Sequence, residues 1–127
     1  MLGFLVGRIL YGGFILNSGW SHFKNNAAFT SYAASKGVPL PKLSVLVSGL
    51  FLLVGGLGIL LGVYVQWAIL ALVLFFVPVT FMMHAYWKDT DPNVKMSNRI
   101  NFWKNVALLG ATLMFLAIPE PWLYSVL

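Results

Sequence analysis

The stretch LSVLVSGLFLLVGGLGILLGVY, from Leu43 to Tyr64, decides the fold, and it contains no charged side chain. An α-helix needs about 20 apolar residues to cross the hydrocarbon core of a bilayer. Because backbone groups in lipid must form their hydrogen bonds within the same segment, a single run of this kind forms a helix rather than a strand. The stretch therefore predicts a helix that spans a membrane.

Three further apolar runs flank this stretch, from Leu2 to Phe23, from Gln66 to Tyr86, and from about Trp103 to Tyr124. The 127 residues are 60% hydrophobic and only 9% charged, which is too apolar for an ordinary soluble domain. We therefore predict an all-α fold, an integral membrane four-helix bundle that forms a single domain over residues 1–127.

Positive charge gathers in two of the links between the predicted helices. The basic residues are Lys24, Lys36 and Lys42 in the first link, and Lys88, Lys95, Arg99 and Lys104 in the last. Short loops rich in lysine and arginine stay on the cytoplasmic side of a membrane. We therefore expect both links to face the cytoplasm and both chain termini to lie outside. The net charge of +5 then reflects how the chain is oriented in the membrane, and we expect no nucleic-acid partner.

The first basic link carries a helical pattern of its own, NNAAFTSYAASK from Asn25 to Lys36. Phe29, Tyr32 and Ala33 share one face of that helix, because residues three and four apart lie one turn apart. Gly37 follows as a stop signal. We predict a short amphipathic interfacial helix between the first two spanning helices.

Small residues mark one face of the second predicted helix. Gly55 and Gly62 share that face, and Gly58 lies beside it. Small side chains let membrane helices approach one another closely. We therefore assign Gly55, Gly58 and Gly62 to helix packing.

Two histidines end two predicted helices on the same side of the membrane. His22 ends the first helix and His84 ends the third, and both helices run toward the cytoplasm, so the rings should lie at similar depth. Thr80 lies one turn before His84, and Lys104 and Asn105 begin the fourth helix at this depth. These five residues form our candidate polar pocket.

Several uses of this pocket remain open. The histidines could anchor the helix ends through carbonyls or head groups, bind a quinone or another substrate, or ligate a b-type haem as facing imidazoles. Anchoring is the plainest use and haem the least favoured. The chain has no cysteine, and no carboxylate falls at the depth of the histidines, so we expect no metal site.

A second polar group is predicted near the outer surface. Arg8 lies on the inward face of the first helix, and Glu120 is the one acidic residue expected on that side. A charged side chain inside a membrane is costly and is usually paired. We therefore predict a structural ion pair between Arg8 and Glu120.

Several of these segments together resemble the DoxX family of small four-helix membrane proteins. They are RILYGGFILNSGWSHF from Arg8, SYAASKGVPLPKLSVLVSGLFLLVGGLGILLG from Ser31, MMHAYWKD from Met82 and FWKNVALLGATLMF from Phe102. The resemblance implies a bacterial or archaeal cell membrane, and a link to membrane-bound oxidoreductase assemblies such as thiosulfate:quinone oxidoreductase. It also makes Arg8, His84, Trp87, Lys104 and Asn105 candidate family residues.

Two departures from the family pattern limit what the resemblance implies. Many relatives carry an acidic residue just before the glycine pair of the second helix, where this chain has Leu52 or a neighbour. They also carry a lysine near the end of the first helix, where this chain has His22. A mechanism that needs the acid is therefore not expected here.

Three classes of function follow. The first is a non-catalytic subunit or scaffold of a quinone-linked or respiratory assembly, which we favour because the chain has no nucleophile constellation. The second is a quinone-binding oxidoreductase component, and the third is a binder or transporter of small molecules or lipid. We assign no catalytic residue, and we expect the lipid bilayer and other membrane proteins as partners.

Overall fold

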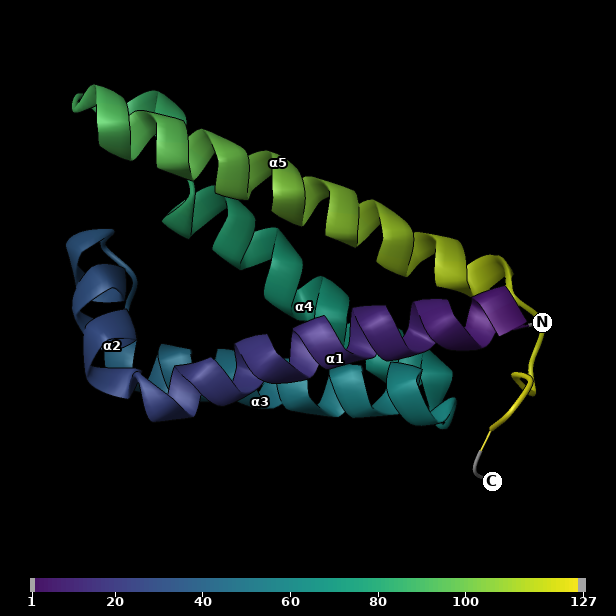
Figure 1. The fold of residues 1–127 in the computed structure, drawn as a ribbon. Helices are drawn as coiled ribbons and strands as arrows, with labels where there is room; N and C mark the ends of the chain where they lie inside the picture. The colour runs from purple at the N-terminus through teal and green to yellow at the C-terminus, as the bar shows by residue number, and fades with distance from the viewer. Residues whose placement is uncertain (1, 126–127) are drawn as a thin grey trace.

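The computed structural model describes residues 2–125, and this part of the chain is helical with irregular links (Figure 1). The α-helices are α1 (Leu2–Lys24), α2 (Asn26–Ser35), α3 (Pro41–Leu61), α4 (Val65–Met83) and α5 (Pro92–Met114). Two short 3₁₀ helices follow α4 and α5, namely η1 (Tyr86–Lys88) and η2 (Phe115–Ala117). In residues 2–125, four segments are long and apolar enough to cross a membrane: α1, α3, Val65–Lys88 and Pro92–Ala117. The predicted all-α four-helix membrane fold is confirmed.

The helix boundaries follow local chemistry. Pro41 begins α3 at a position where a missing amide proton costs nothing, and Gly62 ends it with φ +70°. Only glycine adopts that backbone conformation without strain. A bond of 2.9 Å from the Asn93 amide to the Asp91 side chain caps α5, and Pro92 is its first residue.

The predicted fourth helix, from Trp103 to Tyr124, has the wrong boundaries. In the structure α5 begins at Pro92 and ends at Met114, with η2 extending it to Ala117. Pro119 and Pro121 stop the helix well before Tyr124, because proline cannot continue the hydrogen-bond ladder. The helix starts earlier because Asp91 caps it at Pro92, and its first turns are polar residues that lie outside the apolar run.

The glycines of α3 serve two neighbouring helices rather than one. A Cβ added at Gly55 would meet Leu72, and one added at Gly58 would meet Ala68, so these two glycines seat α4. On another side, Gly49 and Gly56 lie against α1. Gly62 does not pack two helices: it ends α3 and leaves room for the Arg8 side chain.

The helices form two arms, one of α1 with α3 and one of α4 with α5. The arms converge at one end and diverge at the other (Figure 1). Helix α1 packs on α3, α3 on α4, and α4 on α5. At the end near the chain termini, which we call the closed end, the Tyr11 hydroxyl bonds with the Thr112 hydroxyl across α1 and α5. At the opposite end, which we call the open end, α2 stands between the separated arms. The backbones of the two arms are therefore farthest apart at the open end (Figure 1).

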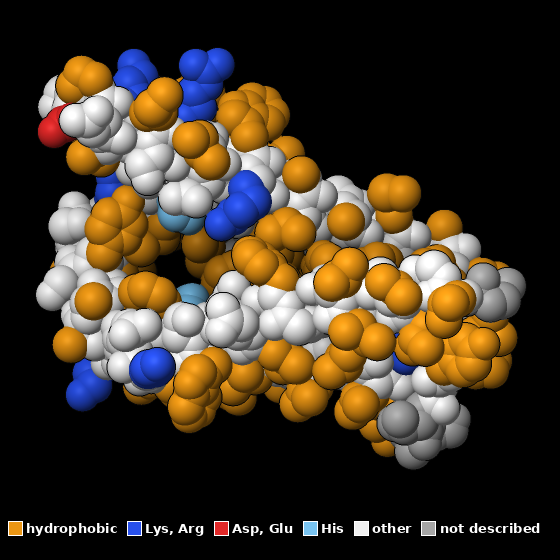
Figure 2. All heavy atoms as spheres, viewed as in Figure 1, with side chains coloured by type: hydrophobic (Ala, Val, Ile, Leu, Met, Phe, Trp, Pro, Cys, Tyr) orange, Lys and Arg blue, Asp and Glu red, His pale blue; other side chains and the backbone are white. Residues whose placement is uncertain are grey.

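Large apolar side chains cover much of the outer surface (Figure 2). Leu10, Leu50, Trp67 and Met114, for example, are each more than half exposed. Such a surface is suited to lipid, where apolar groups lose nothing by exposure. The chain is a membrane protein in contact with the bilayer.

Candidate functional site

A cleft of about 880 Å³ lies between the two arms at the open end. Figure 2 shows it as a hollow with histidine side chains on two sides. All five α-helices contribute to its wall, and the apolar part comes mainly from Phe14, Ile15, Phe51, Leu52, Phe75 and Phe76. The volume falls within the range of small-molecule sites, about 300 to 1,000 Å³.

The candidate polar pocket is largely assembled on this cleft. His22, His84, Lys104 and Asn105 all line it, from α1, the end of α4, and α5. Thr80 does not line it: its side chain is buried, and its Oγ1 has no hydrogen-bond partner within residues 2–125. The structure therefore brings four of the five predicted residues to one space and leaves Thr80 outside it.

The His22 ring is held against α3. Its Nδ1 lies 3.1 Å from the Val45 carbonyl oxygen and 3.0 Å from Ser48 Oγ. Because a carbonyl oxygen only accepts, Nδ1 carries the proton in the neutral ring, and Nε2 is then an unprotonated acceptor. The edges of Phe29 and Phe75 enclose the ring.

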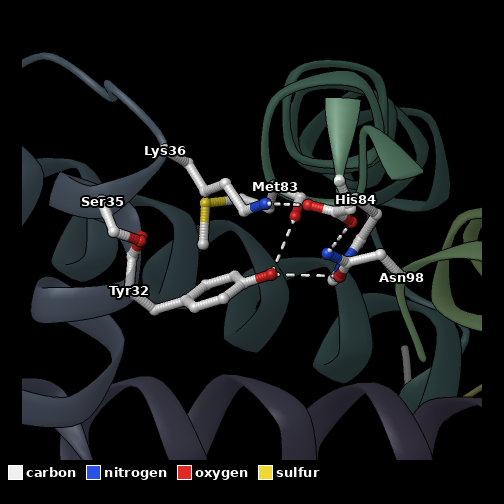
Figure 3. Close-up of polar contacts among 7 residues, drawn as sticks. Tyr32, Ser35, Lys36, Met83, His84 and Asn98 are labelled. Carbon is white, nitrogen blue, oxygen red and sulfur yellow. Dashed lines mark hydrogen bonds and ion pairs between the residues drawn. The ribbon is translucent and has the colours of Figure 1, made fainter. Parts of the chain in front are cut away.

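The His84 ring has the same arrangement on the other arm. Its Nδ1 lies 3.2 Å from Asn98 Oδ1, and the same oxygen accepts a 3.0 Å bond from the Tyr32 hydroxyl (Figure 3). The Asn98 amide nitrogen donates to Asp89 Oδ2 at 2.8 Å, which fixes the amide so that its oxygen faces the ring. His84 is therefore also a Nδ1 donor whose Nε2 is left as an acceptor in the neutral state.

The side chains of Asn98 and Asp89 also hold α2 at the open end, through Tyr32 and Lys36. Lys36 Nζ lies 3.1 Å from Asp89 Oδ1, and the single Tyr32 hydroxyl proton is shared between Asn98 Oδ1 and the Met83 carbonyl oxygen, which lies 3.2 Å from the hydroxyl oxygen (Figure 3). The bonds from Asn98 and Lys36 hold the pKa of Asp89 below its usual value. Phe29, Tyr32 and Ala33 line the cleft, so the apolar face of the predicted interfacial helix faces this space.

The α5 side of the cleft offers unpaired polar groups. Asn105 is only 7% exposed, and within residues 2–125 its side-chain amide forms no hydrogen bond. Lys104 Nζ contacts Asn101 Oδ1 at 3.4 Å and lies 5.7 Å from the centre of the Phe14 ring on α1. Among the described residues, the side-chain atoms that are both buried and without a partner are Thr80 Oγ1 and Trp122 Nε1, so the Asn105 amide atoms remain accessible from the cleft.

Sequence reasoning missed Asn98, Tyr32 and Asp89 as members of this site. A signal was present on α5, because Asn98, Asn105 and Thr112 are seven residues apart and share one helical face. The prediction that the helix begins at Trp103 placed Asn98 in a loop and hid the pattern.

The predicted ion pair between Arg8 and Glu120 is wrong. Arg8 is 3% exposed and donates to four carbonyl oxygens: Ile59 at 3.2 Å, Leu60 at 3.0 Å, Tyr124 at 3.3 Å, and Leu123. Glu120 instead accepts a 3.2 Å bond from the Gln66 side chain. The last carbonyls of a helix have no partner within the helix, and their partial negative charge attracts a cation. The end of α3 therefore takes the place of the carboxylate.

Comparisons with known proteins agree with the architecture. The family model described as DoxX matches residues 3–85. The Escherichia coli (strain K12) protein called Inner membrane protein YphA is 33% identical over 90 residues, which are 71% of this chain and 63% of that protein. The chain thus spans less than two thirds of that relative's length. No solved structure matches. The family match includes His22 and His84 but stops before the α5 wall of the cleft.

Proposed function

The chain belongs to the DoxX family, and from that premise we propose that it binds an amphipathic small molecule in the cleft at the open end. The observation that carries the proposal is the side chain of Asn105, which lines a large cavity with amide atoms that have no protein partner within residues 2–125 and stay accessible from the cleft. A ligand that enters the cleft would bond to this amide in place of water.

The polar atoms around the cleft indicate which polar head group the ligand would carry. The neutral rings of His22 and His84 each offer an Nε2 acceptor, whereas Asn105 offers both a donor and an acceptor. Lys104 adds a cationic donor at the edge. A ring that carries hydroxyl or carbonyl oxygens would match this set, and the aromatic wall suits an apolar ring and tail. A quinol or quinone is the ligand class that we propose.

The chain would act as the ligand-holding member of a membrane assembly rather than as an enzyme alone. Quinone chemistry needs a donor or acceptor of electrons, and we find no such group among the side chains of the cleft. A partner protein would have to supply it. This is the non-catalytic subunit role predicted from the sequence, and copurification in mild detergent followed by mass spectrometry of proteins and quinones would test it.

Binding itself is tested in nanodiscs with a short-chain quinone, in its reduced and oxidised forms, by quenching of tryptophan fluorescence. We expect Asn105→Leu to weaken binding about tenfold, because a lost hydrogen bond in a desolvated site is worth roughly 1.5 kcal/mol. Asn93→Leu is the matched control, since Asn93 is exposed and lies outside the cleft. Equal affinity of the two variants would remove the proposal.

A lipid binder is the second candidate, favoured by the apolar depth of the cleft. A monoacylglycerol, whose head carries hydroxyl groups, is the probe in the same assay. Tight binding of this lipid and no binding of the quinone would replace the first ligand class with the second.

A further inference from the structure

A second groove lies on the outer side of α5, away from the cleft. It has a volume of about 710 Å³ and is lined by Tyr86, Pro92, Lys95, Met96, Arg99, Ile100 and Trp103. Met96, Ile100 and Trp103 lie on the face of α5 opposite Asn98 and Asn105, because their positions differ by about half a helical turn. The groove and the cleft therefore share a helix but no lining residue.

The chemistry of this groove is amphipathic. Lys95 and Arg99 are four residues apart and form one cationic row, and both are exposed. Within residues 2–125, neither of them forms an ion pair or a side-chain hydrogen bond. Beside that row, Met96 is 66% exposed, Ile100 63% and Trp103 54%. Two free cations thus adjoin a strip of exposed apolar side chains.

The length of the spanning segment places this groove at the membrane border. Residues Pro92–Ala117 number 26, so as a helix they extend about 39 Å at about 1.5 Å per residue. The hydrocarbon core is only about 30 Å thick, which leaves about 9 Å outside it. The polar residues are at the N-terminal end, so we place the first turns of α5 among the lipid head groups. Trp103 follows Pro92 by eleven residues, so its position is about 16 Å along the helix and about 7 Å inside the hydrocarbon border.

We propose that this groove binds one anionic phospholipid from the leaflet that surrounds it. The phosphate lies between Lys95 and Arg99, and an acyl chain runs along Met96, Ile100 and the Trp103 ring. An arginine and a lysine together match a phosphate in charge and in donor geometry. The occupant is a lipid rather than a soluble anion because the apolar strip continues from the cations toward the hydrocarbon.

The test uses delipidated full-length protein in a neutral detergent, titrated with dioleoylphosphatidylglycerol, dioleoylphosphatidylcholine or sodium phosphate. Bound lipid is counted by native mass spectrometry, and the thermal midpoint is followed in parallel. We expect phosphatidylglycerol to bind and to raise the midpoint, and phosphatidylcholine and phosphate to do neither. Lys95→Gln/Arg99→Gln should weaken the lipid about tenfold, because each cation near an anionic membrane surface contributes several-fold.

The matched control is Lys24→Gln/Lys42→Gln, which removes two exposed cations from the other basic link. It should bind phosphatidylglycerol like the wild type. Both double variants replace exposed side chains, so their midpoints without lipid should equal that of the wild type, which separates lost binding from lost folding. The proposal is overturned if the two lipids bind equally, if the two double variants behave alike, or if free phosphate competes as well as the lipid binds.

Discussion

The Arg8 guanidinium at the closed end and the polar side chains that line the cleft at the open end are bonded in different ways. At the closed end the Arg8 guanidinium donates to four backbone carbonyls, and its charge lies 5.4 Å from the Phe4 ring and 5.7 Å from the Trp122 ring. At the open end the rings of His22 and His84 are fixed through Nδ1 only, and the Asn105 amide has no partner within residues 2–125. A polar group that is fully bonded within the protein holds the fold. One that faces a cavity with spare atoms is available to a ligand.

The same contrast explains why the arms diverge. Glycines allow α1, α3 and α4 to approach closely, as at Gly19 and Gly55. On α5 the positions that face the cleft at the open end are larger amides, such as Asn98 and Asn105, and Asn98 bonds to Tyr32 of α2. The arms therefore lie close together where glycines meet and stay apart where longer polar side chains line the gap.

Removal of Arg8 should have the largest effect on this comparison. In Arg8→Leu, four carbonyls lose their donor, and the C-terminal segment loses its bonds through Leu123 and Tyr124 but keeps the bond from Ser125 Oγ to the Gly62 carbonyl at the end of α3. Because each buried acceptor left without a partner costs about 1 to 3 kcal/mol, we expect a loss of at least about 3 kcal/mol in unfolding free energy. Chemical unfolding in detergent, followed by circular dichroism, measures it.

Two further variants sharpen the test of Arg8. Arg8→Lys keeps the charge but not the planar fork, so it should recover only part of the loss. Lys24→Leu replaces an exposed cation on the same helix and should leave stability within about 0.5 kcal/mol of the wild type. If Arg8→Leu were as stable as Lys24→Leu, the closed end would not depend on the guanidinium.

Gly55→Ala should have the next largest effect, because it forces apart the helices that join the two arms. The new methyl group would meet the Leu72 side chain of α4 and lie 3.2 Å from the Ala68 carbonyl oxygen. Overpacking of this kind costs about 1 to 3 kcal/mol. Gly13→Ala is the control, since nothing lies within 4 Å of a Cβ at that position. Thermal midpoints in the same detergent compare the two, and a drop in both would point to helix propensity or lipid rather than packing.

The spanning helices could be predicted from the sequence because hydropathy is a local property. The runs around α1, α3 and α4 are predominantly apolar, and their predicted bounds agree with the observed ones to within about three residues at each end. The start of α5 was missed because its first turns are polar, and a search for apolar length ignores them. The Asp91 cap followed by Pro92 was the local signal that would have found it.

The contacts of the site were harder to predict because they depend on how the helices are arranged in space. The sequence places Arg8 on an inward face, but it does not show that the end of α3 lies beside it, so a carboxylate was the natural partner to propose. His22 and His84 line one cavity, because the helices that carry them end at the same end of the bundle. Their common depth in the membrane stays a prediction. The gap between them depends on the divergence of the arms, which no local pattern encodes.

The smallest effect we expect concerns the contacts of Asp89 that hold α2 at the open end. These contacts should weaken at low pH. The bonds from Asn98 and Lys36 lower the pKa of Asp89 in the folded state. The carboxylate therefore contributes fully to stability above its unfolded-state pKa of about 3.9, and this contribution is lost as the pH falls through the lower folded-state pKa. Thermal midpoints measured from about pH 6 to 3 should therefore fall at the acid end, and Asp89→Asn should remove this part of the fall. Lys36→Gln should reduce it, because Asn98 still holds the carboxylate, whereas Lys24→Gln should leave it unchanged. If the wild type and the three variants lost stability in parallel, the acid sensitivity would come from another group. The contacts that hold α2 would then not depend on the charge of Asp89.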